Sequence, residues 1–111
     1  MPKINSLLTK HNSLIDIIAL RLEQSSFHNY KLSKNIVYDS SEIDLLAIER
    51  NKILIFEIKC NDRNKCVEKS RKQLRKHYNY IRSLNKKSDI YLFEVYGYKG
   101  SLDYFVRRYT P

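Results

Sequence analysis

The sequence predicts an α/β fold in which helices flank one central, mixed β-sheet. Two segments, residues 5–23 and 67–84, repeat apolar side chains at intervals of three and four, which is typical of amphipathic helices. Shorter runs rich in β-branched and aromatic residues lie between and after them, which is typical of strands. Because helices and strands are interleaved along the chain, the pattern indicates a layered α/β architecture.

The first half of the chain predicts one helix and three strands. The helix over residues 5–23 has an apolar stripe formed by Leu7, Leu8, Leu14, Ile15, Ile18 and Leu22. Residues 27–38 predict an edge strand with a basic loop, and two further strands are expected at residues 43–50 and 53–60. We expect Asn51 and Lys52 to form the tight turn between these two strands, because Asn tolerates a positive φ.

The second half predicts a long helix and one or two more strands. The apolar stripe of the helix over residues 67–84 is formed by Val67, Leu74, Tyr78, Ile81 and Leu84. Residues 89–98 then predict a strongly apolar strand, followed by a turn at Lys99 and Gly100. The last segment, residues 102–109, is expected to be a strand or a short helix. The predicted order is therefore α-β-β-β-α-β and then β or α, in one domain that spans residues 1–111.

The charge of the chain favours a polyanionic partner. The sequence has 21 Lys and Arg residues against 12 Asp and Glu residues, which gives a formal net charge of +9. Nucleic acid and an anionic membrane surface are the partners that such an excess favours. No apolar run reaches the ~20 residues of a transmembrane helix, and the N-terminus lacks the apolar segment of a signal peptide. We therefore expect an intracellular protein without a membrane span.

Charged residues interrupt the two predicted central strands at Asp44, Glu57 and Lys59. If residues 51 and 52 form a two-residue turn, Asp44 lies directly opposite Lys59 in the antiparallel pair. Side chains alternate between the two faces of a sheet, so Glu57 and Lys59 share one face and Asp44 joins them there. The two carboxylates are then diagonal neighbours, roughly 7 Å or less apart, and both can bind one hard cation.

A cation held by these two carboxylates suits the hydrolysis of a phosphodiester bond. Mg²⁺ binds through a few carboxylate oxygens and water, which leaves positions open for a phosphate oxygen. The metal lowers the pKa of a bound water and neutralises negative charge in the transition state. Lys59 would orient or deprotonate that water, or stabilise the transition state.

Asp44, followed thirteen residues later by Glu57-Ile58-Lys59, resembles the D-x(n)-E-x-K signature of the PD-(D/E)XK nuclease superfamily. The helix before the signature, Gln73 on the helix after it and the apolar strand that follows are most similar to the archaeal-type Holliday junction resolvases. The resemblance extends over nearly the whole chain. It implies a restriction-endonuclease-like fold and a metal-dependent DNA endonuclease that acts on branched or duplex DNA.

The resemblance also implies a role for each matching residue. Asp44 and Glu57 would bind Mg²⁺ or Mn²⁺, with the backbone carbonyl of Ile58 as a third ligand. Lys59 would be the catalytic lysine, and Gln73 would support the site or contact the phosphate.

Two further implications of the resemblance concern the first helix and the assembly. Resolvases tend to carry an acid on the first helix, for which Asp16 is the nearest candidate and Glu23, one heptad later, is the alternative. They cut two strands symmetrically, so the resemblance implies a C2 homodimer. The stretch YFVRRY, residues 104–109, is the expected dimer seam.

Basic residues concentrate in the second predicted helix and in the loop before it. Residues 63–87 contain ten Lys and Arg residues and one acid, Glu68. Like charges four residues apart destabilise a helix, so we interpret these residues as a track for the DNA backbone rather than as an ordinary solvated face. The predicted DNA-binding residues are Lys34, Arg63, Lys65, Lys69, Arg71, Lys72, Arg75 and Lys76.

Other functions stay open at this point. Gln73 is followed by His77, and the pair resembles the Q-x-x-x-Y pattern of RecB-like and Cas4-like exonucleases, with His in place of Tyr. A restriction-type endonuclease has the same acidic signature. A basic DNA-binding module with this fold and no catalysis is the alternative outside the enzymes.

The remaining metal-binding residue types are not expected to form a site of their own. His11 and His28 are expected to be surface residues, and together with His77 they are too scattered for a metal site. Cys60 and Cys66 are expected to be thiols, with a disulfide as the alternative.

Overall fold

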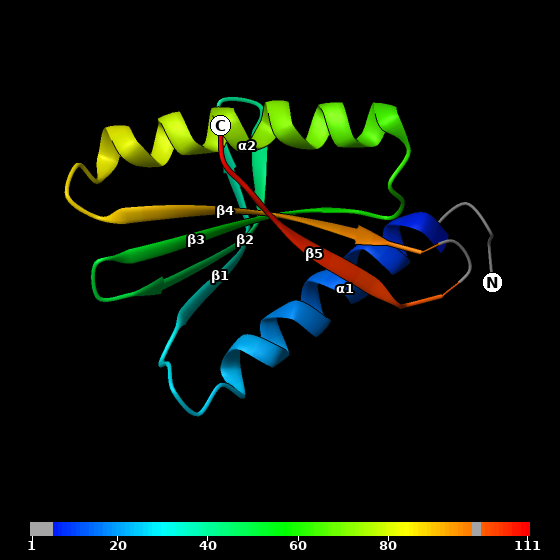
Figure 1. Cartoon of the computed structure of the whole chain (residues 1–111), viewed down its shortest axis with the longest axis horizontal. Coiled ribbons are helices and arrows are strands. Elements are labelled where there is room, and N and C mark those ends of the chain that lie inside the picture. The colour runs from blue at the N-terminus through cyan, green and yellow to red at the C-terminus, as the bar shows by residue number, and fades with distance from the viewer. Residues whose placement is uncertain (1–5, 99–100) are drawn as a thin grey trace.

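The computed structural model describes residues 6–98 and 101–111, and it places one helix on each face of a five-stranded β-sheet (Figure 1). The elements are α1 (Ser6–Glu23), β1 (Lys31–Tyr38), β2 (Ser41–Glu49), β3 (Lys52–Lys59), α2 (Asn64–Leu84), β4 (Asp89–Gly97) and β5 (Tyr104–Tyr109). The predicted α/β class and order of elements are confirmed, and the last segment is a strand. Asn5, the predicted start of the first helix, and the predicted turn at Lys99 and Gly100 lie outside the described residues.

The strands lie side by side in the order of the chain, β1-β2-β3-β4-β5. Every neighbouring pair is antiparallel except β3 and β4, which are parallel. A parallel pair requires a crossover connection, and α2 provides it by running back over one face of the sheet (Figure 1). The C-terminal end of β3 therefore lies next to the beginning of α2.

Each helix covers its own hydrophobic core. The core on the α1 side includes Leu14, Ile15, Ile18, Ala19, Leu45, Leu54, Phe56 and Ile58. The core on the α2 side includes Tyr38, Ile43, Leu46, Ile53, Ile55, Leu74 and Leu92. Because successive residues of β3 point to opposite faces, Glu57 and Lys59 lie on the α2 side, which confirms that they share a face.

The turn between β2 and β3 lies one residue earlier than predicted. Glu49 pairs with Lys52, so Arg50 and Asn51 form the turn, and Arg50 adopts the positive φ of 52°. Lys52 belongs to β3 because it also pairs with Asp89 of β4, whose amide donates a hydrogen bond to the carbonyl of Asn51 at 2.7 Å. Pairing with a distant strand thus decides the position of the turn, against the local preference of Asn for positive φ.

The prediction that Asp44 lies opposite Lys59 is consequently wrong. The pairing of β2 with β3 is shifted by two residues, and the ladder ends where Leu45 pairs with Phe56. Asp44 and Glu57 directly follow this last pair on their two strands. A shift of one residue would have turned the side chains of β2 to the other face, whereas a shift of two does not.

The β1–β2 hairpin bends at Asn35 and Asp44. Regular pairing is interrupted there, and Asn35 has a positive φ of 53°. Leu45, on one side of the bend, belongs to the core under α1, while Ile43 and Ile36, on the other side, pack in the core under α2. The hairpin therefore crosses from one face of the sheet to the other, and Asp44 lies at the crossing point.

The tip of this hairpin is anchored on α2. Tyr38 pairs with Ser41, and the two residues between them, Asp39 and Ser40, have φ of 41° and 62°. Positive φ at both central positions is the requirement of a type I′ turn, whose twist matches that of the strands. Tyr38 stacks on Tyr80 of α2, with ring centroids 3.9 Å apart.

Two predictions outside the sheet can also be compared with the structure. Cys60 and Cys66 both carry thiols, as predicted. Among the described residues, no helix is both long enough and apolar enough to cross a membrane.

Replacing Ser40 by Gly should stabilise the protein. Gly adopts positive φ without the cost of a Cβ atom and makes the favoured Asp-Gly sequence of a type I′ turn, so we expect about 0.5–1 kcal/mol of added unfolding free energy. Equilibrium urea unfolding measures the change. Ser33→Gly, at an exposed position within β1, is the matched control and should destabilise by a similar amount. An equal decrease in unfolding free energy for Ser40→Gly and Ser33→Gly would contradict the turn geometry.

Candidate active site

The predicted acids meet at the C-terminal end of β3, where the bend of β2 approaches both helices. Asp44 is 7% exposed and Glu57 is 4% exposed. The Asp44 carboxylate accepts a hydrogen bond from the backbone N–H of Ile58 at 2.8 Å. The bond ties β2 to β3 immediately beyond the end of their ladder, so both acids are held by the sheet.

The two carboxylate oxygens of Glu57 face different partners. Oε2 lies 3.2 Å from Nζ of Lys59, and Oε1 lies 3.4 Å from Nε2 of His77 on α2. Burial raises the pKa of Glu57 and the charge of Asp44 raises it further, and the opposing effects of His77 and Lys59 do not cancel this rise. A buried carboxylate next to a second one is stabilised by a bound cation.

The lysine and glutamine of the predicted site line one groove. Lys59 and Gln73 border a groove of about 480 Å³ together with Lys69, Lys72 and Lys76 of α2. The three α2 lysines and Gln73 recur at intervals of three and four, so they share one face of the helix. The groove thus brings four lysines and Gln73 together, and one of these lysines, Lys59, contacts the buried Glu57 carboxylate.

His11 was missed as a member of the site. It was expected to be a surface residue, but it is only partly exposed on α1, and its Nε2 lies 3.4 Å from Oδ2 of Asp44. The hydrogen bond to Asp44 raises the pKa of His11 against the opposing effect of partial burial, and hydrogen bonding to the Ile58 backbone adds to the rise. The signal in the sequence was its position, three and four residues before Leu14 and Ile15 on the buried stripe of the helix.

The acids predicted for the first helix lie elsewhere. Asp16 is an exposed residue, with 67% of its side chain accessible, and forms an ion pair with Lys34 at 2.8 Å. Glu23 is exposed at the end of α1. Among the described residues, His11 is the side chain of α1 that contacts Asp44, and Lys34 is engaged with Asp16 rather than with the groove.

The predicted DNA-binding residues of α2 separate into two groups. Lys69, Lys72 and Lys76 line the groove, and Nζ of Lys76 also donates to the Ser41 hydroxyl at 2.5 Å. On another side of the helix, Arg71 and Arg75 contact β4 and β5 instead: Arg75 donates to the Tyr109 hydroxyl at 2.7 Å. Two further residues of the set, Arg63 and Lys65, are exposed around the first turn of α2.

Arg71 is part of a buried network around Glu94, which is 0% exposed. The Glu94 carboxylate accepts hydrogen bonds from Arg71 at 2.8 Å, from Arg107 at 3.1 Å and from the Tyr96 hydroxyl at 2.6 Å. Burial alone would raise the pKa of Glu94, but these three hydrogen bonds outweigh it and the pKa is lowered. Arg71 therefore joins α2 to β4 and β5.

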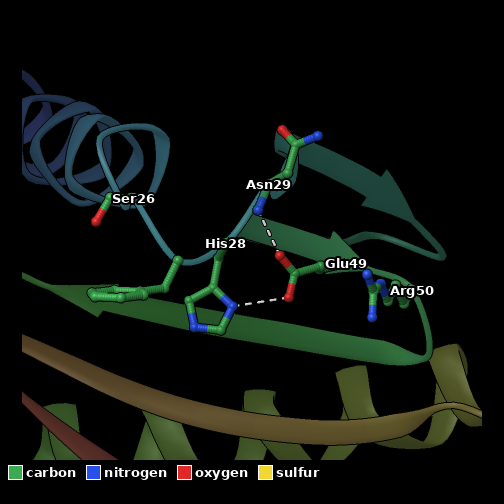
Figure 2. Close-up of a pocket in the computed structure, with 6 residues that line it drawn as sticks. Ser26, His28, Asn29, Glu49 and Arg50 are labelled. Carbon is green, nitrogen blue, oxygen red and sulfur yellow. Dashed lines mark hydrogen bonds and ion pairs between the residues drawn. The ribbon is translucent and has the colours of Figure 1, made fainter.

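A second pocket, of about 510 Å³, lies at the opposite end of the β2–β3 hairpin (Figure 2). Here Glu49 accepts hydrogen bonds from His28 at 2.9 Å and from the Asn29 amide at 2.5 Å, so both carboxylate oxygens are occupied. His28 is exposed, as predicted. Since Glu49 in the pocket wall is five residues from Asp44 along β2, about 17 Å at a rise of ~3.3 Å per residue, the pocket does not belong to the candidate site.

The donor set of the site fits a hard divalent cation. The predicted ligands, which are the carboxylates of Asp44 and Glu57 and the backbone carbonyl of Ile58, would supply only oxygen, which Mg²⁺ and Mn²⁺ prefer. Both acids are buried, and a bound cation would compensate their negative charge. No group of three or more His, Cys, Asp and Glu side chains in the described parts of the chain is placed to hold a metal, so an ion here would also need backbone oxygens or water.

Comparison with known families agrees with this geometry. Residues 11–90 match the family described as NERD, the nuclease-related domain. The match begins at His11 and includes both acids, Lys59, Gln73 and the groove. No curated protein matches the chain. The predicted restriction-endonuclease-like fold is confirmed, since five strands and two helices occur in the expected order in a chain that matches a nuclease family.

Replacing Glu94 by Gln should destabilise the protein in a pH-dependent way. Loss of the charged hydrogen bonds should cost about 1–3 kcal/mol at pH 7. Because the pKa of Glu94 is lower in the folded than in the unfolded state, the wild-type advantage is present above the unfolded value of about 4.3 and is lost as the pH falls through the folded value.

Urea unfolding of both proteins at pH 7 and pH 3 measures this difference. The difference in unfolding free energy between Arg71→Ala and the wild type should also become smaller at low pH, since this substitution removes a partner of Glu94. Lys72→Ala, the neighbouring exposed residue, is the control and should unfold like the wild type at both pH values. A Glu94→Gln deficit that stays constant with pH would contradict the role of the network.

Proposed function

Because the chain belongs to the NERD family of nuclease-related domains, we propose that it is a metal-dependent DNA endonuclease with Asp44, Glu57 and Lys59 at its active centre. One observation carries the proposal. Two carboxylates on adjacent strands are buried, and the lysine that contacts one of them lines a groove together with three more lysines. Buried acids are costly for a fold unless they are paired or bind a metal, and lysines in a groove attract phosphates.

The proposed metal is Mg²⁺ or Mn²⁺, held by the carboxylates of Asp44 and Glu57 and by the backbone carbonyl of Ile58. When bound, the ion would lower the pKa of a water and neutralise charge on the phosphate under attack. The chain contributes the rigid placement of the ligands. The Ile58 amide orients Asp44, and the sheet fixes Glu57 between Lys59 and His77.

Lys59 connects the buried acids with the groove. Its Nζ lies 3.2 Å from Glu57, and its side chain remains 27% exposed. An ammonium group in this position would orient the attacking water or stabilise negative charge as it develops on the phosphate. Gln73, on the same groove, would donate a hydrogen bond to a phosphate oxygen.

We further propose that the substrate is branched DNA, as in a Holliday junction resolvase, and that two copies act as a C2 homodimer. The order of elements and the spacing of the signature support the first point, because they are most similar to archaeal-type resolvases. The second is supported by β5, an edge strand of the sheet on which Val106 is 46% exposed. Symmetric copies would place two active centres for paired cuts.

An exonuclease is the second candidate, and one contact favours it. Gln73 and His77 occupy the positions of a Q-x-x-x-Y pattern, and His77 touches the Glu57 carboxylate. A RecB-like or Cas4-like enzyme would require a DNA end, which a closed junction or circle does not offer. A restriction-type endonuclease would cut linear duplex at internal sites, and a binding module would not cut at all.

Cleavage of a labelled four-way junction and of a labelled linear duplex separates these functions. With Mg²⁺ or Mn²⁺, the wild type should introduce paired, symmetric nicks into a four-way junction and leave linear duplex intact. Glu57→Ala and Lys59→Ala should bind the junction but cut at least about 10²-fold more slowly, because each removes a charge that acts at the reacting phosphate. Degradation from ends alone would indicate an exonuclease, and internal cutting of linear duplex would indicate a restriction-type endonuclease. Binding without metal-dependent cutting would indicate a binding module.

Salt titration of DNA binding tests the groove. If Lys69 and Lys72 each neutralise a phosphate, replacing either by Ala should reduce the slope of log K against log salt by roughly 0.9 on duplex DNA. Arg75→Ala should leave the slope unchanged, because this side chain is directed to Tyr109. Equal slopes for all four proteins would show that DNA does not follow the groove.

A further inference from the structure

A chain of buried side chains connects the tip of the β1–β2 hairpin with Glu57. The hydroxyl of Tyr38 lies 2.6 Å from Nδ1 of His77, and Nε2 of His77 lies 3.4 Å from Oε1 of Glu57. His77 is 0% exposed, and Tyr38 is buried as well. His77 thus stands between a residue of the proposed active centre and a residue 39 positions before it in sequence.

The two contacts of the His77 ring favour one of its tautomers. Burial raises the pKa of Tyr38 to about 12, so its hydroxyl keeps its proton and can donate to Nδ1. A neutral imidazole that accepts at Nδ1 carries its hydrogen on Nε2. The atom that Nε2 faces, at 3.4 Å, is Oε1 of Glu57, and both atoms are buried without a hydrogen-bond partner. Each is the natural partner of the other.

Tyr38 is itself held from several sides. Its ring stacks on Tyr80 at a centroid distance of 3.9 Å and an interplanar angle of 7°. Nζ of Lys76 lies 6.0 Å from the centre of the same ring. The turn at Asp39 and Ser40 returns the chain directly after Tyr38, so the hydroxyl is delivered from a fixed backbone.

We propose that His77 is a positioning residue that holds Oε1 of Glu57 inside the protein and leaves Oε2, beside Lys59, as the oxygen that faces the metal. Tyr38 acts one step further away by fixing the Nε2–H tautomer of His77. The inference rests on the proposed metal-dependent function and adds to it an assignment of the two oxygens of one ligand. Partners of this kind orient metal ligands, and their loss typically weakens metal binding.

The alternative is that His77 only fills the core. A histidine satisfied by Tyr38 would then contribute to stability, and an apolar residue of similar size would change stability without changing metal affinity. The two readings differ in what happens to Glu57 in a folded variant. If His77 positions Glu57, the carboxylate can rotate once His77 is replaced. The oxygen that faces the metal is then no longer defined.

Mn²⁺ titration by calorimetry distinguishes them. His77→Leu should bind Mn²⁺ about 10–100-fold more weakly than the wild type, the range found when such partners are lost. His77→Gln, whose amide nitrogen can replace Nε2 as donor, should restore most of the affinity. Tyr38→Phe keeps the stacked ring and should weaken binding by up to about tenfold. Tyr80→Phe is the matched control and should bind Mn²⁺ like the wild type, since the Tyr80 hydroxyl takes no part in the contacts that join Tyr38, His77 and Glu57.

Nitrogen NMR of the metal-free proteins provides a second readout that does not depend on metal binding. The wild type should show His77 as the Nε2–H tautomer, and Tyr38→Phe should show a mixture of both tautomers. Folded His77→Leu and Tyr38→Phe proteins with wild-type Mn²⁺ affinity, or a wild-type Nδ1–H tautomer, would overturn the inference. A wild type that binds no Mn²⁺ would instead overturn the metal-dependent function, while the tautomer would still report whether His77 donates to Glu57.

Discussion

The hydrogen bond from the Ile58 amide to the Asp44 carboxylate is the contact on which the site depends. The β2–β3 ladder ends at Leu45 and Phe56, and β2 then turns away toward α2. Beyond that point the Ile58 amide faces no backbone partner on β2, and a buried amide without a partner is costly. Asp44 supplies the missing acceptor at 2.8 Å. One carboxylate therefore completes the sheet and takes part in the site, so its position is fixed by the fold.

The bend also explains how acids can be buried in a chain with a net charge of +9. Neither Asp44 nor Glu57 lies in the middle of an apolar layer. Each lies where two elements separate and a polar group from a helix can reach it: His11 from α1 reaches Asp44, and His77 from α2 reaches Glu57. The two helices thus stabilise one acid each, from opposite faces of the sheet. Lys59 adds a positive charge 3.2 Å from Glu57.

Much of the fold could be predicted because its signals are local. Helical periodicity and strand-forming runs gave the element order, and the alternation of faces along β3 gave the common side of Glu57 and Lys59. The exact pairing of β2 with β3 could not be predicted from the turn residues. Lys52 is held in β3 by its pairing with Asp89, 37 positions away in sequence, and a local turn preference does not include this contact. The predicted pairing was shifted by two residues, and only because this number is even did the predicted face of each side chain remain correct.

The candidate site was predictable where it follows a linear pattern and not where it depends on tertiary packing. Asp44, Glu57, Lys59 and Gln73 form a spacing that can be read along the chain. The neighbours of these residues come from elements that the spacing does not include. His11 lies on α1, for which the sequence predicted an acid as the site residue, and the nearest such acid, Asp16, is paired with Lys34 on the surface. Tyr38 reaches the site only because the hairpin bends at Asn35, which has no signature in sequence beyond a residue type that tolerates positive φ.

The helix α2 has a mechanical consequence for any ligand in the groove. Lys69, Lys72 and Lys76 lie on one of its faces, His77 on the next, about 100° further round, because one residue advances a helix by that angle. Arg71 fastens the same rod to Glu94. A rotation of α2 about its axis to bring the lysines closer to a polyanion would move His77 away from Glu57. It would also distort the contact between Arg71 and Glu94. The backbone of α2 is therefore held in place by its contacts with Glu57 and Glu94, and the exposed lysines adjust to a ligand only through their flexible side chains.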